Sequence, residues 1–438
     1  MTTVARTPHP YVQALLSGSR ALPRAPLAWL NARRGEALER ANALSVPTTR
    51  DEDWRFTDIT PITRVPFRAV SAATRLAAAD VAGLLLPEAT IYLTFVDGVF
   101  ARELSSAVGV PHGVVVSDLA SALHADPTKL ESHLARHARY DHDVFAALNT
   151  AWLHDAAYVH VAKNRACPAP IHVRFVSTQK ETVAYPRTLV VLESGAEAIL
   201  VEEYVALDGA DGYFSNAVTE MVVAENARLR HTKLQREARG AFHIGHHAVA
   251  LAKDARYESD WVTLGARISR NNVNVVQQGE GAECRIDGLT LISGRQLADT
   301  HTVIDHTKAN GRSRQLHKCI VADAAHAVFN GKIYVRAGAQ LTDSGQQSRN
   351  LLLSPKAHVD TKPQLEIFAD DVKCAHGATV GQLDPEQLFY LRSRGLAEAR
   401  ARNLLTFAFG AEVIDRLPVP SLVERLEQVV LEQTQAPE

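Results

Sequence analysis

A short motif recurs along the middle of the chain and constrains the fold more than any other sequence feature. A small or polar residue is followed by Ala, by any residue and then usually by an apolar one. The first three intervals between copies are 31, 28 and 27 residues, and the last is 18. Such periods, without a helical pattern between the copies, are typical of a coil of stacked strands. The copies begin at Gly195, Asn226, Asp254, Gly281, Gly338 and Lys356.

The segments between these copies alternate between apolar and polar residues, as strands with one buried face do. Clear examples are residues 158–161, 257–264 and 272–276. A β-sandwich is the main alternative, and the Asn-Gly pairs at 310–311 and 330–331 would suit hairpin turns. Sandwich strands, however, usually recur about every 8–12 residues with clear hairpin turns between them. The pattern therefore favours a parallel β-helix and leaves the sandwich as its competitor.

Helical patterns flank this strand-rich part, so we expect three regions. Residues 1–155 form a mainly helical region, residues 156–380 form the β-helix core, and residues 381–438 form a helical domain. The last region opens with Asp-Pro-Glu at 384–386, in which Asp suits the N-cap position and Pro the first helical position. Gly395 is expected to end that helix. The expected fold is thus mainly β, with helical regions at both ends.

Charge and composition argue against several classes of function. The chain has 438 residues with 47 Lys and Arg against 49 Asp and Glu, and a net charge of −2 gives no electrostatic basis for nucleic-acid binding. No apolar run approaches the roughly 18–20 residues that cross a bilayer, so no membrane association is expected. Five arginines and no acid in residues 1–35 would suit an organelle transit peptide, but a helical N-terminal region is favoured. We expect a cytoplasmic protein.

The sequence contains no standard catalytic signature. There is no GxxxxGK[ST] phosphate loop, no GxSxG and no HExxH, so neither ATP hydrolysis nor another enzymatic activity is expected of this chain by itself. Four cysteines lie far apart, which argues against a dense disulfide framework and fits a reducing compartment. They are Cys167, Cys284, Cys319 and Cys374.

Two histidine groups, at residues 243–247 and 301–306, contain enough imidazoles and carboxylates to be considered as metal ligands. In a strand, residues i and i+2 share a face, whereas residues i and i+3 do not. The first group is therefore poorly spaced for a site on one strand. Polar lining of a sheet face is the favoured explanation for both groups.

Cys374 and His376 form the sharpest candidate site. If Ala375 lies in an extended segment, the two side chains point to the same side. An imidazole there could lower the thiol pKa, or share a soft metal or a sulfur species with it. The structural alternative is a half-buried Cys beside a hydrogen-bonded His. Two ligands are too few for a stable metal site, so others would come from elsewhere in the fold or from a partner.

One long segment near the end of the strand-rich region is the most distinctive of the chain. It reads Thr361-Lys-Pro-Gln-Leu-Glu-Ile-Phe-Ala-Asp-Asp-Val-Lys-Cys-Ala-His-Gly-Ala-Thr379. Supporting segments lie at residues 329–333, 347–353 and 389–395. Together these segments resemble the SufB/SufD family, whose members are scaffold subunits of the SUF machinery for iron–sulfur cluster assembly. The resemblance is densest between about 299 and 410, and the long segment is similar to SufD members rather than SufB members.

The resemblance implies an architecture and a set of partners. In this family a right-handed parallel β-helix lies between helical regions, which decides against the sandwich. The family resemblance also implies pairing with SufB through the β-helix and docking of one SufC ATPase on the C-terminal helical domain. The nucleotide chemistry would then belong to SufC. A homodimer is a further expectation for the isolated chain.

The resemblance also implies roles for particular residues. The family's Cys-x-His motif falls on Cys374 and His376, with Ala375 where Ser is common. His376 would bind metal transiently in a nascent iron–sulfur cluster at the interface with SufB, and Cys374 would be an auxiliary ligand. No cofactor is expected to be stably bound by this chain alone, and a reduced flavin is implied only for the complex. The segment implied to dock SufC contains Phe389, Tyr390, Leu391, Arg392, Arg394 and Phe407.

A β-helical carbohydrate-active enzyme is the alternative from another class of function. It would need carboxylates that converge on one face of the solenoid. Asp287, Asp299 and Asp305 could supply them if the fold brought them together, but nothing in the sequence does so. A non-enzymatic scaffold subunit is therefore the preferred interpretation.

Overall fold

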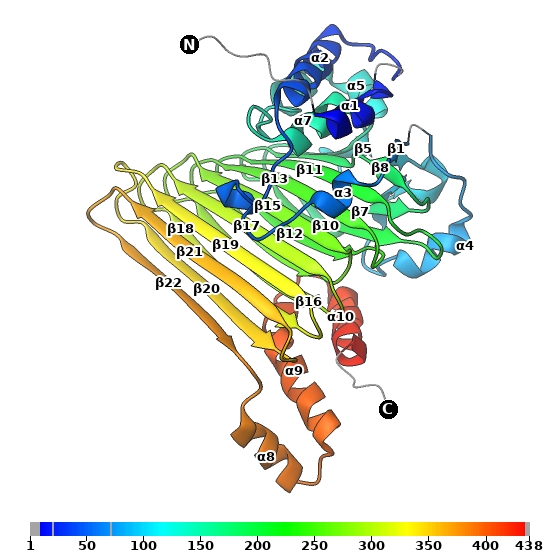
Figure 1. Cartoon of the computed structure of the whole chain (residues 1–438). Coiled ribbons are helices and arrows are strands. Elements are labelled where there is room, and N and C mark those ends of the chain that lie inside the picture. Colours follow the sequence, from blue (N-terminus) through cyan, green and yellow to red (C-terminus); the bar gives the residue numbers. More distant parts are fainter. Residues whose placement is uncertain (1–8, 20–21, 71, 434–438) are drawn as a thin grey trace.

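Two sheets of mainly parallel strands form the centre of the molecule (Figure 1). The computed structural model describes residues 9–19, 22–70 and 72–433. Sheet A contains, in spatial order, β21 (His358–Ile367), β19 (His326–Val335), β17 (Leu297–His306), β15 (Ile268–Gln277), β13 (Phe242–Leu251), β11 (Phe214–Val223), β9 (Arg187–Leu192), β6 (Ala157–Val161) and β5 (Val114–Asp118). Sheet B contains β22 (Lys373–Gly381), β20 (Asp343–Leu352), β18 (Arg312–Val321), β16 (Glu283–Ile292), β14 (Arg256–Thr263), β12 (Arg228–Arg236), β10 (Glu197–Ala206), β7 (Ala166–Ser177), β2 (Ile91–Val96) and β3 (Val99–Phe100).

Consecutive strands from β9 onward alternate between the two sheets, so each coil contributes one strand to each sheet. Within a sheet, each of these strands pairs in parallel with the strand one coil earlier, for example β14 with β16 and β17 with β19. The result is a parallel β-solenoid of about eight turns, which confirms the predicted β-helix and rules out the sandwich. The Asn-Gly pairs form no hairpins: 310–311 lies at a corner between coils, and 330–331 lies inside β19.

The recurring motif marks the corners between coils. Gly195, Asn226, Asp254 and Gly281 all have positive φ values, between 54° and 70°, and Gly, Asn and Asp tolerate this region best. The Ala that follows each of them is fully buried, because only a small side chain fits inside the corner. The copies at Gly338 and Lys356 have no positive φ at their first residue, and near Gly338 the positive φ is at Leu341 instead.

Hydrogen bonds stack these corners on one another. The amide of Gly195 donates to the carbonyl of Glu225 at 2.8 Å, and the amide of Asn226 donates to the carbonyl of Lys253 at 3.0 Å. In the same way, the amide of Asp254 donates to the carbonyl of Glu280 at 2.8 Å. Each coil is therefore held in register with the next at its turn as well as along its strands.

The N-terminal part covers the outer face of sheet A and also adds strands to both sheets. Trp54 and Phe145 pack in one apolar cluster with Phe214 and Phe242 of sheet A. Strand β2 pairs with β7 in sheet B, and β5 pairs antiparallel with β6 in sheet A. The helices of this part are α1 (Pro10–Leu16), α2 (Ala28–Ala43), α3 (Thr60–Thr63), α4 (Ala78–Val81), α5 (Leu119–Ala125), α6 (Pro127–His133) and α7 (Val144–Ala151). Short strands β1 (Arg68–Ala69), β4 (Ser106–Ala107) and β8 (Thr182–Ala184) lie at the sheet margins. The first eight residues of the arginine-rich segment lie outside the described residues.

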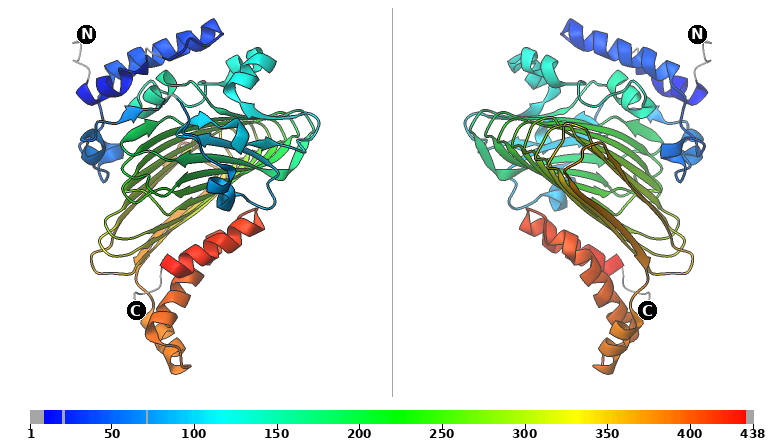
Figure 2. Two further views of the ribbon diagram at one scale, coloured as in Figure 1. Left: turned by 90° about the vertical axis from the view of Figure 1, so that its right-hand side faces the viewer. Right: turned by 90° about the vertical axis from the view of Figure 1, so that its left-hand side faces the viewer.

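Three helices follow the last strand: α8 (Pro385–Ser393), α9 (Glu398–Ile414) and α10 (Pro420–Gln433). Figure 2 shows α9 and α10 on the side of the solenoid opposite the N-terminal helices. Apolar residues of both helices, such as Val413 and Leu426, pack against Leu289 and Ile320 on the outer face of sheet B. As predicted, the Asp384 carboxylate caps α8 by accepting from the Glu386 amide at 2.8 Å. No helix among the described residues is long and apolar enough to span a membrane.

The interior of the middle coils contains a polar cluster beside its apolar core. Glu202 is fully buried, accepts a hydrogen bond from Thr188 at 2.7 Å and pairs with His231 at 3.0 Å. Lys233 donates to Asn271 at 2.6 Å, and burial lowers the pKa of Lys233 to about 7. Polar side chains therefore line the solenoid interior.

The alternation along β13 separates the first histidine group. His243 and His247 are fully buried in the interior, whereas His246 faces outward, 3.5 Å from Asp143. In the second group, His306 bonds Ser313 inside the solenoid. Neither group gathers three metal-ligand atoms among the described residues, so polar lining describes them better than a metal site.

Replacing Asn226 with Val should destabilise the solenoid, because a β-branched residue adopts the left-handed region at a cost of about 1–2 kcal/mol. Asn226→Gly should stay within a few tenths of a kcal/mol of the parent, because Gly adopts this conformation without a steric clash. Thermal unfolding followed by circular dichroism measures the difference. Glu225→Val, at the exposed neighbouring position without positive φ, is the matched control. Equal melting temperatures for the two Val variants would contradict the corner's role.

Candidate functional site

Cys374 and His376 lie on the last strand of sheet B. Strand β22 pairs with β20, and in this register Cys374 opposes Ser344 and His376 opposes Gln346. Ser344 and Gln346 are buried inside the solenoid. Because in-register neighbours and residues i and i+2 share a face, Cys374 and His376 continue this interior column. No further strand covers β22 among the described residues, so Cys374 is only partly buried and His376 is exposed.

The column beneath them is polar and incompletely hydrogen-bonded. Ser313 and Ser344 share a hydrogen bond of 2.7 Å, and His306 bonds Ser313 at 3.0 Å. The amide of Gln346 is buried, and both its nitrogen and its oxygen lack a partner within the described part of the chain. An unpaired buried amide is costly, at about 1–3 kcal/mol. The end of the solenoid beside His376 thus offers both a donor and an acceptor to an incoming group.

A groove of about 730 Å³ runs beside this end of the solenoid. Residues 375–379 of β22 form one wall, and Glu412 of α9 and Arg416, two residues after the end of α9, contribute to another. Its charged lining is mainly basic. The charged side chains are Arg285, Arg314, Arg349, Arg416, Asp287 and Glu412.

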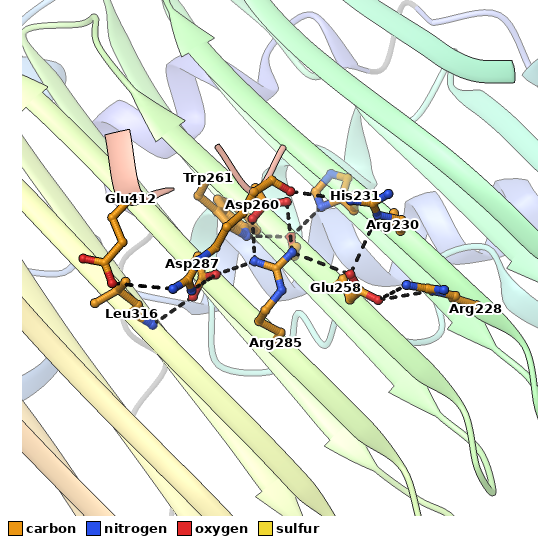
Figure 3. A network of polar contacts seen from close by, with 12 residues as sticks. Arg228, Arg230, His231, Glu258, Asp260, Trp261, Arg285, Asp287, Leu316 and Glu412 are labelled. Atoms are coloured by element: carbon orange, nitrogen blue, oxygen red, sulfur yellow. Dashed lines mark hydrogen bonds and ion pairs between the residues drawn. The ribbon is translucent and has the colours of Figure 1, made fainter. Parts of the chain in front are cut away.

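A buried ionic network fixes α9 at this groove (Figure 3). Arg285 lies between Asp260 and Asp287, and it bonds Asp260 at 2.8 Å. Both carboxylates are buried, and burial raises the pKa of Asp260 despite its bond to Arg285. Arg416, just after the end of α9, reaches the same Asp287 at 2.8 Å. The network therefore connects two neighbouring strands of sheet B, β14 and β16, with the C-terminal helical part.

Helix α8 extends away from the solenoid (Figure 1) and has no buried residue. The side chains of Phe389 and Tyr390 are 74% and 56% exposed. Arg394 lies over the Tyr390 ring at 5.3 Å, and the exposed Arg392 pairs with Glu398 at 3.3 Å. Leu391 is partly buried. An exposed aromatic pair with neighbouring guanidinium groups is a surface suited to contact with another protein.

Phe407 differs from the other residues of the predicted docking segment. It lies on α9, is partly buried and packs against the apolar cluster between sheet B and α10. Phe407 therefore helps to hold α9 on the solenoid. The sequence alone could not separate Phe407 from Phe389, because both occur in helices with mixed patterns.

The cysteines are all unpaired, and burial raises their pKa values. The pKa of Cys284 and of Cys319 is raised to about 12. Burial also raises the pKa of Cys374, whereas a neighbouring imidazole could have lowered it. Partial burial at the last coil is the main cause of this shift, so a half-buried cysteine, the structural alternative, describes Cys374. Cys374 is mainly a neutral thiol at physiological pH.

The three carboxylates considered for a carbohydrate-active enzyme do not converge. Asp287 belongs to the network on sheet B, whereas Asp299 and Asp305 lie six residues apart on β17 in sheet A. The two aspartates of β17 pair with different arginines. Asp299 forms an ion pair with Arg270, and Asp305 accepts two hydrogen bonds from Arg336. The described residues therefore provide no paired carboxylates from this set.

The fold and the site define a β-solenoid protein with an uncovered terminal coil and a projecting helix, an arrangement suited to assembly with other proteins. Residues 175–409 match the family model for the SufBD core domain of SUF-system iron–sulfur cluster assembly, and residues 8–173 match the SufBD N-terminal region. The chain therefore belongs to the SufBD family of iron–sulfur cluster assembly proteins, and within it the chain is of the SufD type.

Three relatives span most of the chain. It is 39% identical to an iron–sulfur cluster assembly SufBD family protein of Synechocystis over 92% of this chain and 90% of that protein. It is 35% identical to the iron–sulfur cluster assembly protein SufD of Escherichia coli, over 87% of each. It is 33% identical to the chloroplastic protein ABCI7 of Arabidopsis thaliana, over 85% of this chain and 79% of that protein.

Thiol labelling should distinguish Cys374 from the other cysteines. In the folded protein one thiol should react, slowly at pH 7, because a raised pKa leaves little thiolate. The rate should rise with pH and continue to rise beyond pH 9, as the thiolate fraction increases. Ellman's reagent measures this rate, Cys374→Ser should abolish it, and unfolding should expose all four thiols. A rate that levels off below pH 8 would contradict the assigned direction.

Proposed function

We propose that the chain is a non-enzymatic scaffold subunit of the SUF complex in the cytoplasm, pairing with SufB and supporting de novo iron–sulfur cluster formation. The observation that carries this proposal is the uncovered strand β22 with His376 beside the unpaired amide of Gln346. An uncovered edge strand can accept a strand from another protein. Pairing there would bring ligands of SufB next to His376. In the absence of SufB, two copies of this chain would pair through the same edge.

The chemistry assigned to this end of the solenoid is transient ligation of the growing cluster. His376 would donate a neutral imidazole nitrogen, and Cys374 would lose its proton on binding iron as an auxiliary ligand. The remaining ligands would come from SufB and from sulfide. The basic side chains of the neighbouring groove would favour anionic sulfur species near the site. The cluster is the product here, and a reduced flavin, where needed, would be held by the complex.

His376→Ala should strongly reduce cluster formation while leaving the complex intact, because His376 is exposed and supports no packing. Cys374→Ser should have a smaller effect. Iron and acid-labile sulfide in purified complexes measure assembly, and size-exclusion chromatography checks that SufB and SufC remain bound. His112→Ala, another exposed histidine, is the matched control. Normal cluster content in an intact His376→Ala complex would overturn the proposed ligand role.

We propose α8 as the docking site for the SufC ATPase. Its exposed Phe389 and Tyr390 have the character of interface anchors, and Leu391, Arg392 and Arg394 flank them. The ionic contact of Arg416 with Asp287 then links the helical domain to the strands that line the groove. Movement of a docked ATPase would reach the assembly site through α9. If SufC hydrolyses the ATP and this chain serves as the scaffold, this chain needs no phosphate loop.

Phe389→Asp and Tyr390→Asp should each weaken SufC binding by about thirtyfold or more, as the loss of an interface anchor of about 2 kcal/mol does. The solenoid should stay folded, because α8 has no buried residue. Isothermal titration calorimetry with SufC and circular dichroism provide the two measurements. Val108→Asp is the matched control, because Val108 is also 74% exposed but lies in the N-terminal part. Unchanged affinity in both variants would move the docking site away from α8.

A further inference from the structure

A group of two histidines and one aspartate lies across the last two coils, separate from the proposed assembly site. His326 begins β19 and His358 begins β21, and parallel pairing places them directly opposite each other. Asp360 lies two residues after His358 and so shares its face. Val359 between them packs inward against the apolar cluster of the end coils. The three side chains therefore face outward from sheet A.

Their ligand atoms already converge. Asp360 Oδ2 lies 2.8 Å from His326 Nε2 and 3.2 Å from His358 Nε2. The two rings are 4.9 Å apart between centroids, with planes at 49°. This is the only group of three His, Cys, Asp or Glu ligand atoms within 4.8 Å of one another in the part of the chain that the structure describes.

We propose that His326, His358 and Asp360 bind a divalent transition-metal ion such as Zn²⁺ or Fe²⁺. Metal–nitrogen bonds of about 2.0–2.1 Å require donor atoms about 3 Å apart, as observed between the carboxylate oxygen and each imidazole. Two imidazoles favour such ions over Mg²⁺ or Ca²⁺, which prefer oxygen ligands. His358 is 64% exposed, so solvent or a further ligand reaches the remaining coordination positions.

The bound ion would tie the edge of the solenoid together. Strand β21 is the last strand of sheet A and pairs only with β19 there. An ion held by one residue of β19 and two residues of β21 cross-links these strands. Any ligand that binds only the folded chain stabilises it in proportion to its occupancy, so the ion should raise the temperature of unfolding.

Isothermal titration calorimetry of the full chain with Zn²⁺ tests the proposal. One equivalent should bind and raise the melting temperature, and anaerobic Fe²⁺ should compete for the same site. His358→Gln and Asp360→Asn should each weaken Zn²⁺ binding at least about tenfold and abolish the thermal shift. Both side chains are at least partly exposed, so folding should be unaffected, which circular dichroism verifies. Mg²⁺ at the same concentration should produce neither effect.

Two control variants localise the ion. His301→Gln alters an outward histidine that pairs with Asp299 at 3.0 Å but has no second imidazole, so Zn²⁺ affinity should be unchanged. Cys374→Ser combined with His376→Ala should also leave it unchanged, which separates this site from the proposed assembly site. Absence of stoichiometric Zn²⁺ binding to the parent chain overturns the proposal. So does parental affinity in His358→Gln and Asp360→Asn, or loss of binding in the Cys374/His376 double variant.

Discussion

The whole solenoid depends on each coil turning at the same place as the coil before it. The amide of each corner residue donates to a carbonyl of the next coil, and Asn226 and Asp254 adopt positive φ to make this possible. Parallel pairing then carries the register along every strand. A slip of one residue would turn every side chain to the opposite face, including Cys374 and His376. The faces on which the last coil presents its side chains therefore depend on correct turns in the coils before it.

The two ends of the solenoid differ in how far other elements cover them. Near the first coil, β2 and β5 extend the sheets, and the N-terminal helices cover the outer face of sheet A. At the other end, the described residues leave β22 uncovered, and they leave the amide of Gln346 unpaired beneath it. Uncovered strand edges invite pairing with other chains, and proteins usually protect them unless pairing is useful. This asymmetry is the physical basis for placing partner contact at β22.

Local rules explain which features the sequence could predict. The corner motif was visible because only Gly, Asn and Asp fit a left-handed turn easily, and Cys374 and His376 share a face because a strand alternates. The network around Arg285 could not be predicted, because it joins two coils and the segment that follows α9. The group at His326 and His358 could not be predicted for the same reason. Coil lengths vary, so the sequence does not show which residues of successive coils become neighbours. The sequence left the direction of the Cys374 pKa shift open, because that direction depends on burial.

The last coil carries its two donor groups on opposite faces of the solenoid wall. Cys374 and His376 continue the interior column of sheet B, whereas His358 and Asp360 face outward from sheet A. On sheet A the last strand is held by side chains: Asp360 bonds His326 of the coil before, and Lys362 reaches Glu52 of the N-terminal part at 2.7 Å. Among the described residues, β22 has no comparable outward anchor to the N-terminal part, and its side chains are largely exposed. The sheet A strand of the terminal coil is thus fixed, while its sheet B strand stays accessible. A surface that accepts a partner needs both properties, because binding must not unwind the solenoid.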